Sequence, residues 1–296
     1  MSEIKFMTTI TVKPPTKFAR ILQIIRELCS SPLVAFSLVI VLLFFVVGIT
    51  ADYIAPYDPI KIDIRNKLSG PSWDHWLGTD QLGRDVLSRL IVGTKIALYL
   101  AVTSVSIALT IGIVLGMIAA FTNQWIDWAL LLVFDTVKSF PGIMFALTIV
   151  ALFGPSVNSI VVVIVFSTFP SYARLVRTQV MSLRNSEFIE AQRAMGSSLP
   201  RILRLHILPN VIGPVLIVAS MDVPLVIGVE AGLSFLGLGV RPPTPSWGSI
   251  LNDGFLFIRN TPWIVFAAGI PLILTTVAFT SLGESLRDIL DPKLRK

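Results

Sequence analysis

The sequence predicts an all-α polytopic membrane protein with six transmembrane helices and both termini in the cytoplasm. Hydrophobic residues make up 54% of the 296 residues and charged residues only 14%, whereas a soluble domain carries about 25% charged residues. Uncharged apolar runs long enough to cross a bilayer recur along the chain. Basic residues cluster at both ends of the chain and within 173–206, which the positive-inside tendency places in the cytoplasm. The net charge of +6 is therefore read as topological, and no nucleic-acid partner is expected.

Residues 1–31 form a polar, predominantly basic head that the same tendency places in the cytoplasm. An uncharged apolar run follows, and residues 32–51 are assigned to the first transmembrane helix because about 20 apolar residues span the hydrocarbon core. The run is long for the core of a cleaved signal peptide, and no clear small-x-small cleavage site follows it. The sequence therefore favours a membrane anchor over a cleaved signal peptide.

Residues 52–89 are expected to form the first extracytoplasmic loop, since charges of both signs alternate there with prolines and glycines. The string GTDQLGRD at 78–85 is read as a capped turn. In this turn Asp80 and Asp85 accept hydrogen bonds from backbone amides, and Arg84 pairs with one of the two carboxylates. Residues 90–296 are then a five-helix membrane core.

The first two helices of this core are expected over 96–126 and 128–152. The second of them contains Asp135, Lys138 and Pro141. Charged side chains at membrane depth are costly, and by default they are functional candidates. Two interpretations stay open: the i, i+3 spacing lets Asp135 and Lys138 neutralise each other, or these charges belong to a solute path or gate.

Three further helices are expected over 159–169, 211–229 and 261–282. Asp222 and Pro224 interrupt the middle one, which we expect to end at Glu230. Asp222 either lines an aqueous path or pairs with a partner subunit. Residues 230–261 are expected to be external again, as a stiff proline-rich loop anchored at the membrane interface by Trp247.

The longest polar stretch between membrane-spanning segments covers 187–210 and reads as a cytoplasmic helical hairpin. Ser186 is in position to cap the first helix, and Phe188, Ala191 and Met195 fall on one side of it at helical spacing. Gly196 is expected to end that helix in a left-handed conformation. A second helix is expected to open at Ser198 and Pro200 and to close at Pro209.

The hairpin resembles the EAA loop of inner-membrane permeases in binding-protein-dependent ABC importers. The resemblance rests on E-A-x-x-x-x-G and, after a spacer, I-L-P-N, which here are Glu190, Ala191, Gly196, Ile207, Leu208, Pro209 and Asn210. Two positions depart from the general form, with Gln192 at the usual second alanine and His206 at an apolar position.

Further signatures follow the same family in the expected order and are similar to its dipeptide, oligopeptide and nickel branch. They are G-T-D-x-x-G-R-D-x-x-S-R at 78–89, the string EAGLSFLGLGVRPPTPSWG at 230–248, and L-R-D-x-L-D-P-x-L-R at 286–295. Asp135 and Pro141 match the family's D-x-x-x-x-x-P pattern, whereas Lys138 has no counterpart in it.

The resemblance implies one transmembrane subunit of an ABC importer, forming half of a translocation path for peptides or a related small solute. It implies four kinds of partner: a second permease, two ATP-binding subunits, an extracytoplasmic substrate-binding protein and the membrane lipid. No cofactor is expected in this chain, since ATP and magnesium would be bound by the ATP-binding subunits. The residues implied in coupling to those subunits are Glu190, Ala191, Gly196, His206, Ile207 and Pro209, and those suggested for the path are Asp135 and Asp222.

The residues themselves argue against an enzyme. The chain has no P-loop sequence for ATP hydrolysis, one cysteine and two histidines far apart, so neither a catalytic nor a metal site is expected. A membrane-embedded enzyme would have only Asp135, Lys138 and Asp222 within its helices. An ion-driven secondary transporter is the alternative function, but the sequence shows no obvious internal repeat and the cytoplasmic hairpin would be left without a role. The sequence does not identify the solute.

Overall fold

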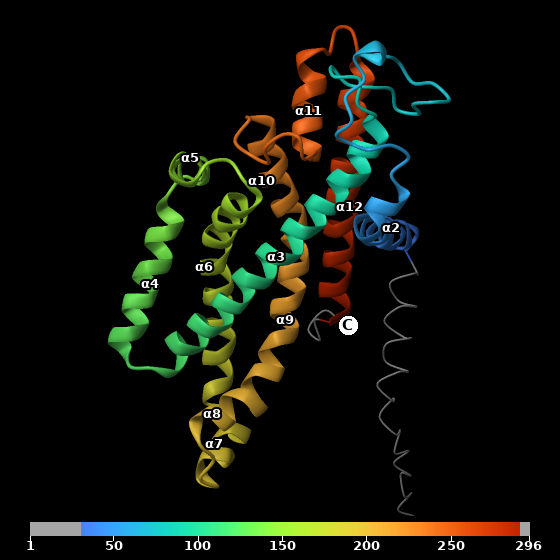
Figure 1. Cartoon of the computed structure of the whole chain (residues 1–296). Coiled ribbons are helices and arrows are strands. Elements are labelled where there is room, and N and C mark those ends of the chain that lie inside the picture. Colours follow the sequence, from blue (N-terminus) through green and yellow to red (C-terminus); the bar gives the residue numbers. More distant parts are fainter. Residues whose placement is uncertain (1–30, 291–296) are drawn as a thin grey trace, which may run out of the picture.

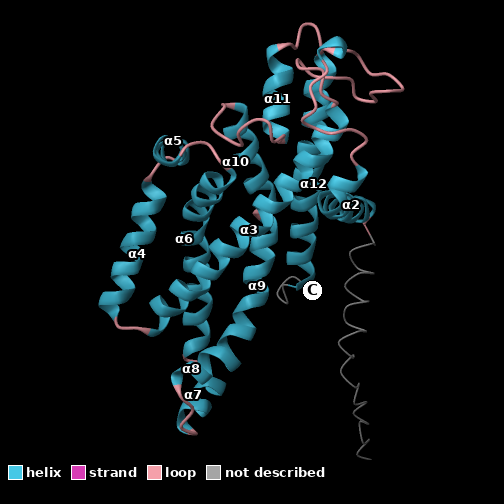
Figure 2. Ribbon diagram, in the orientation of Figure 1, coloured by secondary structure: helices cyan, strands magenta, loops and turns pink. Residues whose placement is uncertain are grey.

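The structure, a computed structural model, describes residues 31–290, and within them it is almost entirely helical (Figure 1, Figure 2). The head at 1–30 and the last six residues of the chain lie outside the described residues. The elements are α2 (Pro32–Ile54), η1 (Ile64–Asn66), α3 (Val86–Phe121), α4 (Gln124–Ser139), α5 (Gly142–Phe153), α6 (Val157–Arg184), α7 (Glu187–Ala194), α8 (Leu199–Ile202), η2 (Leu203–Ile207), α9 (Leu208–Met221), α10 (Val223–Phe235), α11 (Trp247–Leu256) and α12 (Pro262–Leu290).

Five helical segments of the described chain are long and apolar enough to cross a membrane, and α4 with α5 makes a sixth if this bent pair is counted as one span. The prediction of an all-α polytopic membrane protein is confirmed. The number of crossings and the side on which each end lies stay predictions.

The helix expected over 128–152 is two helices, and the expectation of a single one was wrong. α4 and α5 meet at an angle of 87°. Phe140 between them has an extended backbone, with φ −75° and ψ 128°, because the ring of Pro141 disfavours a helical conformation in the residue before it. α5 therefore runs almost perpendicular to α4.

The helix expected over 159–169 is much longer and continues as α6 to Arg184, passing Pro170 on the way. Its basic second half is compatible with a helix because Arg177 binds Asp127 of α4 with two hydrogen bonds of 2.6 Å. Arg184 donates to the backbone oxygen of Ala120 at 2.9 Å. The arginines thus attach α6 to its neighbours.

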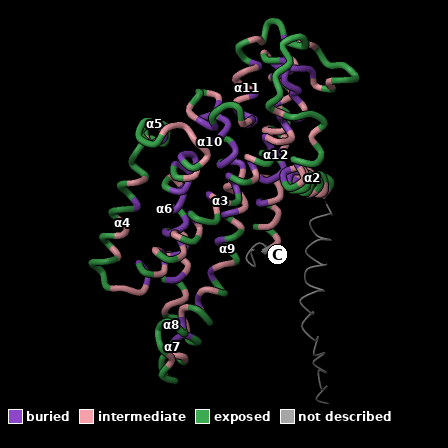
Figure 3. The backbone as a smooth tube through the Cα atoms, viewed as in Figure 1, coloured by how far each residue is buried: buried purple, intermediate pink, exposed green. Residues whose placement is uncertain are grey.

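α3 and α6 pack along each other through small residues of α3. A Cβ added to Gly112 would lie 2.5 Å from the Cβ of Tyr172, and one added to Gly116 would lie 2.8 Å from the Cβ of Val176. Glycine therefore allows the two backbones to approach closely, as small residues do between helices in lipid. Figure 3 shows the buried residues along α6.

A single helical rod runs from Leu199 to Phe235 and contains α8, η2, α9 and α10. Pro209 was expected to close a short helix, and this expectation was wrong. The chain takes one wide turn at Leu203–Ile207, where the Leu208 amide donates to Leu203, and Pro209 then lies in the first turn of α9, where its missing N–H is tolerated. The rod also passes Glu230, which was expected to end it.

At the end of the molecule opposite α7 and α8, residues 55–85 fold over α3, α11 and α12 (Figure 1); we call this the loop end. The predicted capped turn is confirmed there. Asp85 accepts a hydrogen bond from the Ser88 amide at 2.7 Å and so caps α3. Asp80 accepts from the amides of Leu82 and Arg84 and pairs with the Arg84 side chain at 2.7 Å.

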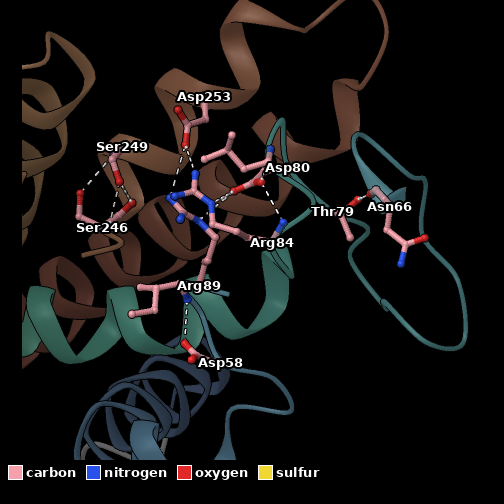
Figure 4. Close-up of polar contacts among 11 residues, drawn as sticks. Asp58, Asn66, Thr79, Asp80, Arg84, Arg89, Ser246, Ser249 and Asp253 are labelled. Carbon is pink, nitrogen blue, oxygen red and sulfur yellow. Dashed lines mark hydrogen bonds and ion pairs between the residues drawn. The ribbon is translucent and has the colours of Figure 1, made fainter. Parts of the chain in front are cut away.

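Arg84, Arg89, Asp80 and Asp253 form a cluster of two buried arginines and two carboxylates (Figure 4). Burial raises the pKa of Asp253, while the two arginines act in the opposite direction. Because Asp253 belongs to α11, the cluster fastens the loop at 55–85 to that helix.

The segment at 230–261 was expected to be an external loop, but it begins in α10 and contains α11. Trp247 was expected at the membrane interface; instead it is buried, and its indole N–H donates to the Leu90 oxygen at 3.1 Å. Glu230 is also buried and accepts a hydrogen bond from Ser234 at 2.6 Å. These polar groups form hydrogen bonds inside the protein, which is why the segment folds back onto the bundle.

Candidate functional site

α7 and α8 form a hairpin at one tip of the molecule, and most of its surface is exposed (Figure 3). We call residues 187–207 the hairpin. The loop end with α11 lies at the opposite tip (Figure 1). The hairpin therefore protrudes from the helical bundle at the tip opposite the loop end.

Buried isoleucines hold the base of the hairpin against the bundle, a role that the sequence did not predict for them. Ile189 and Ile202 are buried and pack with Val176 and Val180 of α6. Burying such side chains contributes roughly 1.5–3 kcal/mol each. The hairpin is thus rigidly attached to α6 although it is exposed.

The turn between α7 and α8 confirms the left-handed conformation expected at Gly196, which has φ +77°. The Gly196 amide donates to Arg193 at 2.9 Å, and the Ser197 amide donates to Gln192 at 3.1 Å. This pair of hydrogen bonds is a Schellman motif. Gln192, one of the departures from the family pattern, has a local role here because its side-chain oxygen accepts from the Ser197 hydroxyl at 3.1 Å.

The six residues predicted to couple to an ATPase do not share one environment. Four are exposed, His206 is half-buried and Ile207 is fully buried. The exposed ones are Glu190, Ala191, Gly196 and Pro209. Ile207 packs in the cluster at the base of the hairpin, so it supports the hairpin and offers no surface. Ser186 occupies the position before α7 but makes no side-chain cap, because its hydroxyl donates to Leu183.

The hairpin also carries an apolar face, of which the predicted set contains only Ala191. Phe188 is 44% exposed and Met195 is 70% exposed, and Ala191 between them is exposed as well. The helical spacing of these three residues was visible in the sequence, but nothing in the sequence showed which side of α7 faces outward. An exposed apolar group rimmed by charged residues is typical of a contact surface.

A cavity of about 560 Å³ lies between α4, α5, α6, α9 and α10. Its lining is mostly apolar, with Lys138, Asp222 and hydroxyl groups of α6 as the polar members. Asp222 therefore lines a cavity inside the bundle, and its role in a solute path stays a prediction.

Asp135 lies elsewhere, since it does not line this cavity and forms an ion pair with Arg174 of α6. The interpretation that Asp135 and Lys138 neutralise each other was wrong, because α6 supplies the partner for Asp135. Among residues 31–290, no group of histidine, cysteine, aspartate and glutamate side chains is placed to hold a metal ion.

Comparisons with known proteins identify the family of this chain. Residues 112–296 match the family described as "Binding-protein-dependent transport system inner membrane component". Residues 21–71 match the "N-terminal TM domain of oligopeptide transport permease C".

Among curated proteins, the chain is 37% identical to the dipeptide transport system permease protein DppC of Alkalihalophilus pseudofirmus, over 91% of this chain and 89% of the relative. It is 38% identical to the glutathione transport system permease protein GsiD of Pectobacterium atrosepticum, over 86% and 85% of the two chains.

Among solved structures, the MetNI methionine ABC transporter in an inward-facing conformation matches with a TM-score of 0.53 at 18% identity, covering 67% of this chain and 95% of the other. An amino acid ABC transporter with histidines matches with a TM-score of 0.53 at 17% identity, covering 69% and 94%. These two likenesses concern the fold. Together with the family match over more than half of the chain, they lead to one conclusion: the chain belongs to the family of inner membrane components of binding-protein-dependent transport systems.

Proposed function

We propose that this chain forms half of the translocation path of an ABC importer and that the hairpin passes the movement of separate ATP-binding subunits to the membrane helices. The observation that carries the proposal is the exposed apolar face of α7 on a hairpin whose base is buried. A rigid base and an unpaired outer face are what a force-transmitting contact requires.

The contact would be made by Phe188, Ala191 and Met195, with Glu190 and Arg193 at their rim. Apolar groups that leave water on binding drive association, and the surrounding charges fix the orientation of the partner. ATP and magnesium would be held by the ATP-binding subunits. Separate ATP-binding subunits would provide a binding partner for the exposed hairpin. An ion-driven secondary transporter would have no such subunit.

The complete importer would contain a second permease, two ATP-binding subunits and an extracytoplasmic substrate-binding protein. The second permease would close the open side of the cavity at Asp222 and so complete the path. The hairpin would face the cytoplasm and the loop end would face the binding protein. The relatives are named for dipeptide and glutathione transport, so the solute we propose is a peptide or a related small molecule.

The test replaces one residue of the apolar face with an acidic residue. Met195→Asp should keep the chain in the membrane, because Met195 is 70% exposed and supports no core contact. It should reduce both ATP-dependent uptake and the recovery of ATP-binding subunits in a pull-down.

Met181→Asp is the matched control, since Met181 is 41% exposed on α6 and lies outside the hairpin. The control should retain both properties. Wild-type uptake and wild-type recovery of the ATP-binding subunits with Met195→Asp would contradict the proposal.

A further inference from the structure

Two charged side chains of opposite sign line the same cavity without forming an ion pair. Lys138 and Asp222 both face the 560 Å³ space, and Lys138 acts electrostatically on the Asp222 carboxylate. Neither belongs to any ion pair among residues 31–290. The two charges are therefore near each other but not in contact.

This arrangement differs from that of the other acids on the neighbouring α4. Asp127 and Asp135 each bind an arginine of α6, so their charges are compensated within the chain. An uncompensated charge at membrane depth is costly and is kept where it serves a ligand or a path. Neither Lys138 nor Asp222 forms such an ion pair among residues 31–290, and the neighbours of the Asp222 carboxylate are the Tyr172 hydroxyl and Lys138.

Both residues stand at interruptions of helices. Lys138 is the next-to-last residue of α4, just before the break at Phe140, and Asp222 lies at the junction of α9 and α10. Helix ends leave backbone groups free for a ligand, and transporters place solute sites at such interruptions. Side chains fixed at these points are held by two separate helices across the cavity.

The remaining polar lining comes from Ser167, Thr168 and Ser171 of α6. The hydroxyls of Ser167 and Thr168 donate to backbone oxygens of their own helix, so their lone pairs stay available to accept. The buried hydroxyl of Tyr172 lies close to the Asp222 carboxylate, although the two do not meet ordinary hydrogen-bond geometry. A mostly apolar cavity of this size with a few convergent polar groups suits a small solute, since such sites measure about 300–1,000 Å³.

We propose that Lys138 and Asp222 form a two-point site for a zwitterionic solute within the translocation path. The Lys138 ammonium binds a carboxylate of the solute, and the Asp222 carboxylate binds an ammonium group. The site rests on the proposed transport function, and it makes this permease itself selective for charge in addition to its binding protein.

The experiment measures uptake by the complete transporter in proteoliposomes, with one binding protein used throughout. The probes are L-alanyl-L-alanine, its C-terminal amide and its N-acetyl derivative. Wild type should take up the free dipeptide in preference to both derivatives. Lys138→Gln should reduce the preference over the amide by about tenfold, the lower bound for one lost charge-assisted hydrogen bond. Asp222→Asn should reduce the preference over the N-acetyl form in the same way.

Two further variants separate the site from a general loss of charge. Lys138→Arg keeps the cation and should keep the preference for the free acid. Lys95→Gln removes a lysine that pairs with Asp52 outside the cavity and should leave every ratio unchanged. Because the binding protein is constant, a changed ratio is due to this chain.

The proposal is overturned if wild type imports the three probes equally or imports none of them, or if Lys138→Gln lowers uptake of all three by one factor. Loss of the second permease from pull-downs of Lys138→Gln would also overturn it, because it would place the lysine at a subunit interface. Uptake by wild type that does not require ATP would contradict the proposed transport function instead of the site.

Discussion

The guanidinium group of Arg84 lies 3.4 Å from the carboxylate of Asp253, although 169 positions separate the two residues in the chain. Arg84 comes from the capped turn before α3, and Asp253 comes from α11 near the other end of the sequence. Asp253 also lies 3.4 Å from Arg89. One carboxylate of α11 thus binds two arginines of the 78–89 segment and holds that segment at the loop end.

The first prediction concerns Asp80, which is 1% exposed and pairs with both arginines of this cluster. Asp80→Asn would leave buried positive charge without its main partner, a change that costs about 3–5 kcal/mol. The variant should show reduced membrane yield and a lower melting temperature in detergent. Asp74→Asn, on an exposed position of the same loop, should leave both unchanged. An equal effect of the two variants would show that the cluster does not stabilise the loop end.

The second prediction concerns the contact between α3 and α6. Gly112→Ala places a methyl group 2.5 Å from the Cβ of Tyr172, and such overpacking costs about 1–3 kcal/mol. Gly213→Ala is the matched control, since no atom lies within 4 Å of its added Cβ. Thermal unfolding followed by size-exclusion chromatography should show a lower midpoint for Gly112→Ala alone. Equal midpoints would mean that the helices do not approach as closely as described.

The third prediction compares two ion pairs by double-mutant cycles. Arg177 and Asp127 are half-buried and joined by two hydrogen bonds, so their coupling energy should reach roughly 1.5–3 kcal/mol. Lys95 and Asp52 are exposed, and their coupling should stay below about 1 kcal/mol. The cycles use Asn or Gln at each position and the free energy of unfolding in detergent. A larger coupling for the exposed pair would contradict the burial of the first pair.

The fourth prediction decides between five and six membrane crossings. With Cys29 replaced by serine, cysteines at Asp74 and Ser198 should react with an impermeant reagent from opposite sides of the membrane. Three crossings separate these positions if α4 and α5 form one span, whereas two separate them if the bent pair enters and leaves on one side. Reaction of both cysteines from the same side would establish the second arrangement. Both positions are exposed.

The sequence was sufficient for the fold class, the hairpin and the capped turn, because each depends on local features. Apolar runs of spanning length, Gly196 in its turn and the carboxylates at 78–85 all act within a few residues of chain.

What could not be predicted depends on partners far apart in the chain. The sequence pairs Asp135 with its neighbour Lys138, but the fold brings Arg174 to it. Tryptophan is a residue type that often lies at the membrane interface, but the indole N–H of Trp247 donates to the backbone oxygen of Leu90 inside the protein. The sequence placed Pro141 inside a helix and Pro209 at the end of one, but the chain bends by 87° at the first and the second lies in the first turn of α9.

The rod from Leu199 to Phe235 contains 37 residues, which at about 1.5 Å per residue gives a length of roughly 55 Å. The arm of the hairpin that starts at Leu199 and Asp222 in the cavity wall therefore belong to one nearly continuous helical segment, which departs from regular α-helix at Leu203–Ile207 and at Asp222. If the hairpin couples to ATP-binding subunits as proposed, a displacement of Leu199 would reach the cavity wall along this backbone.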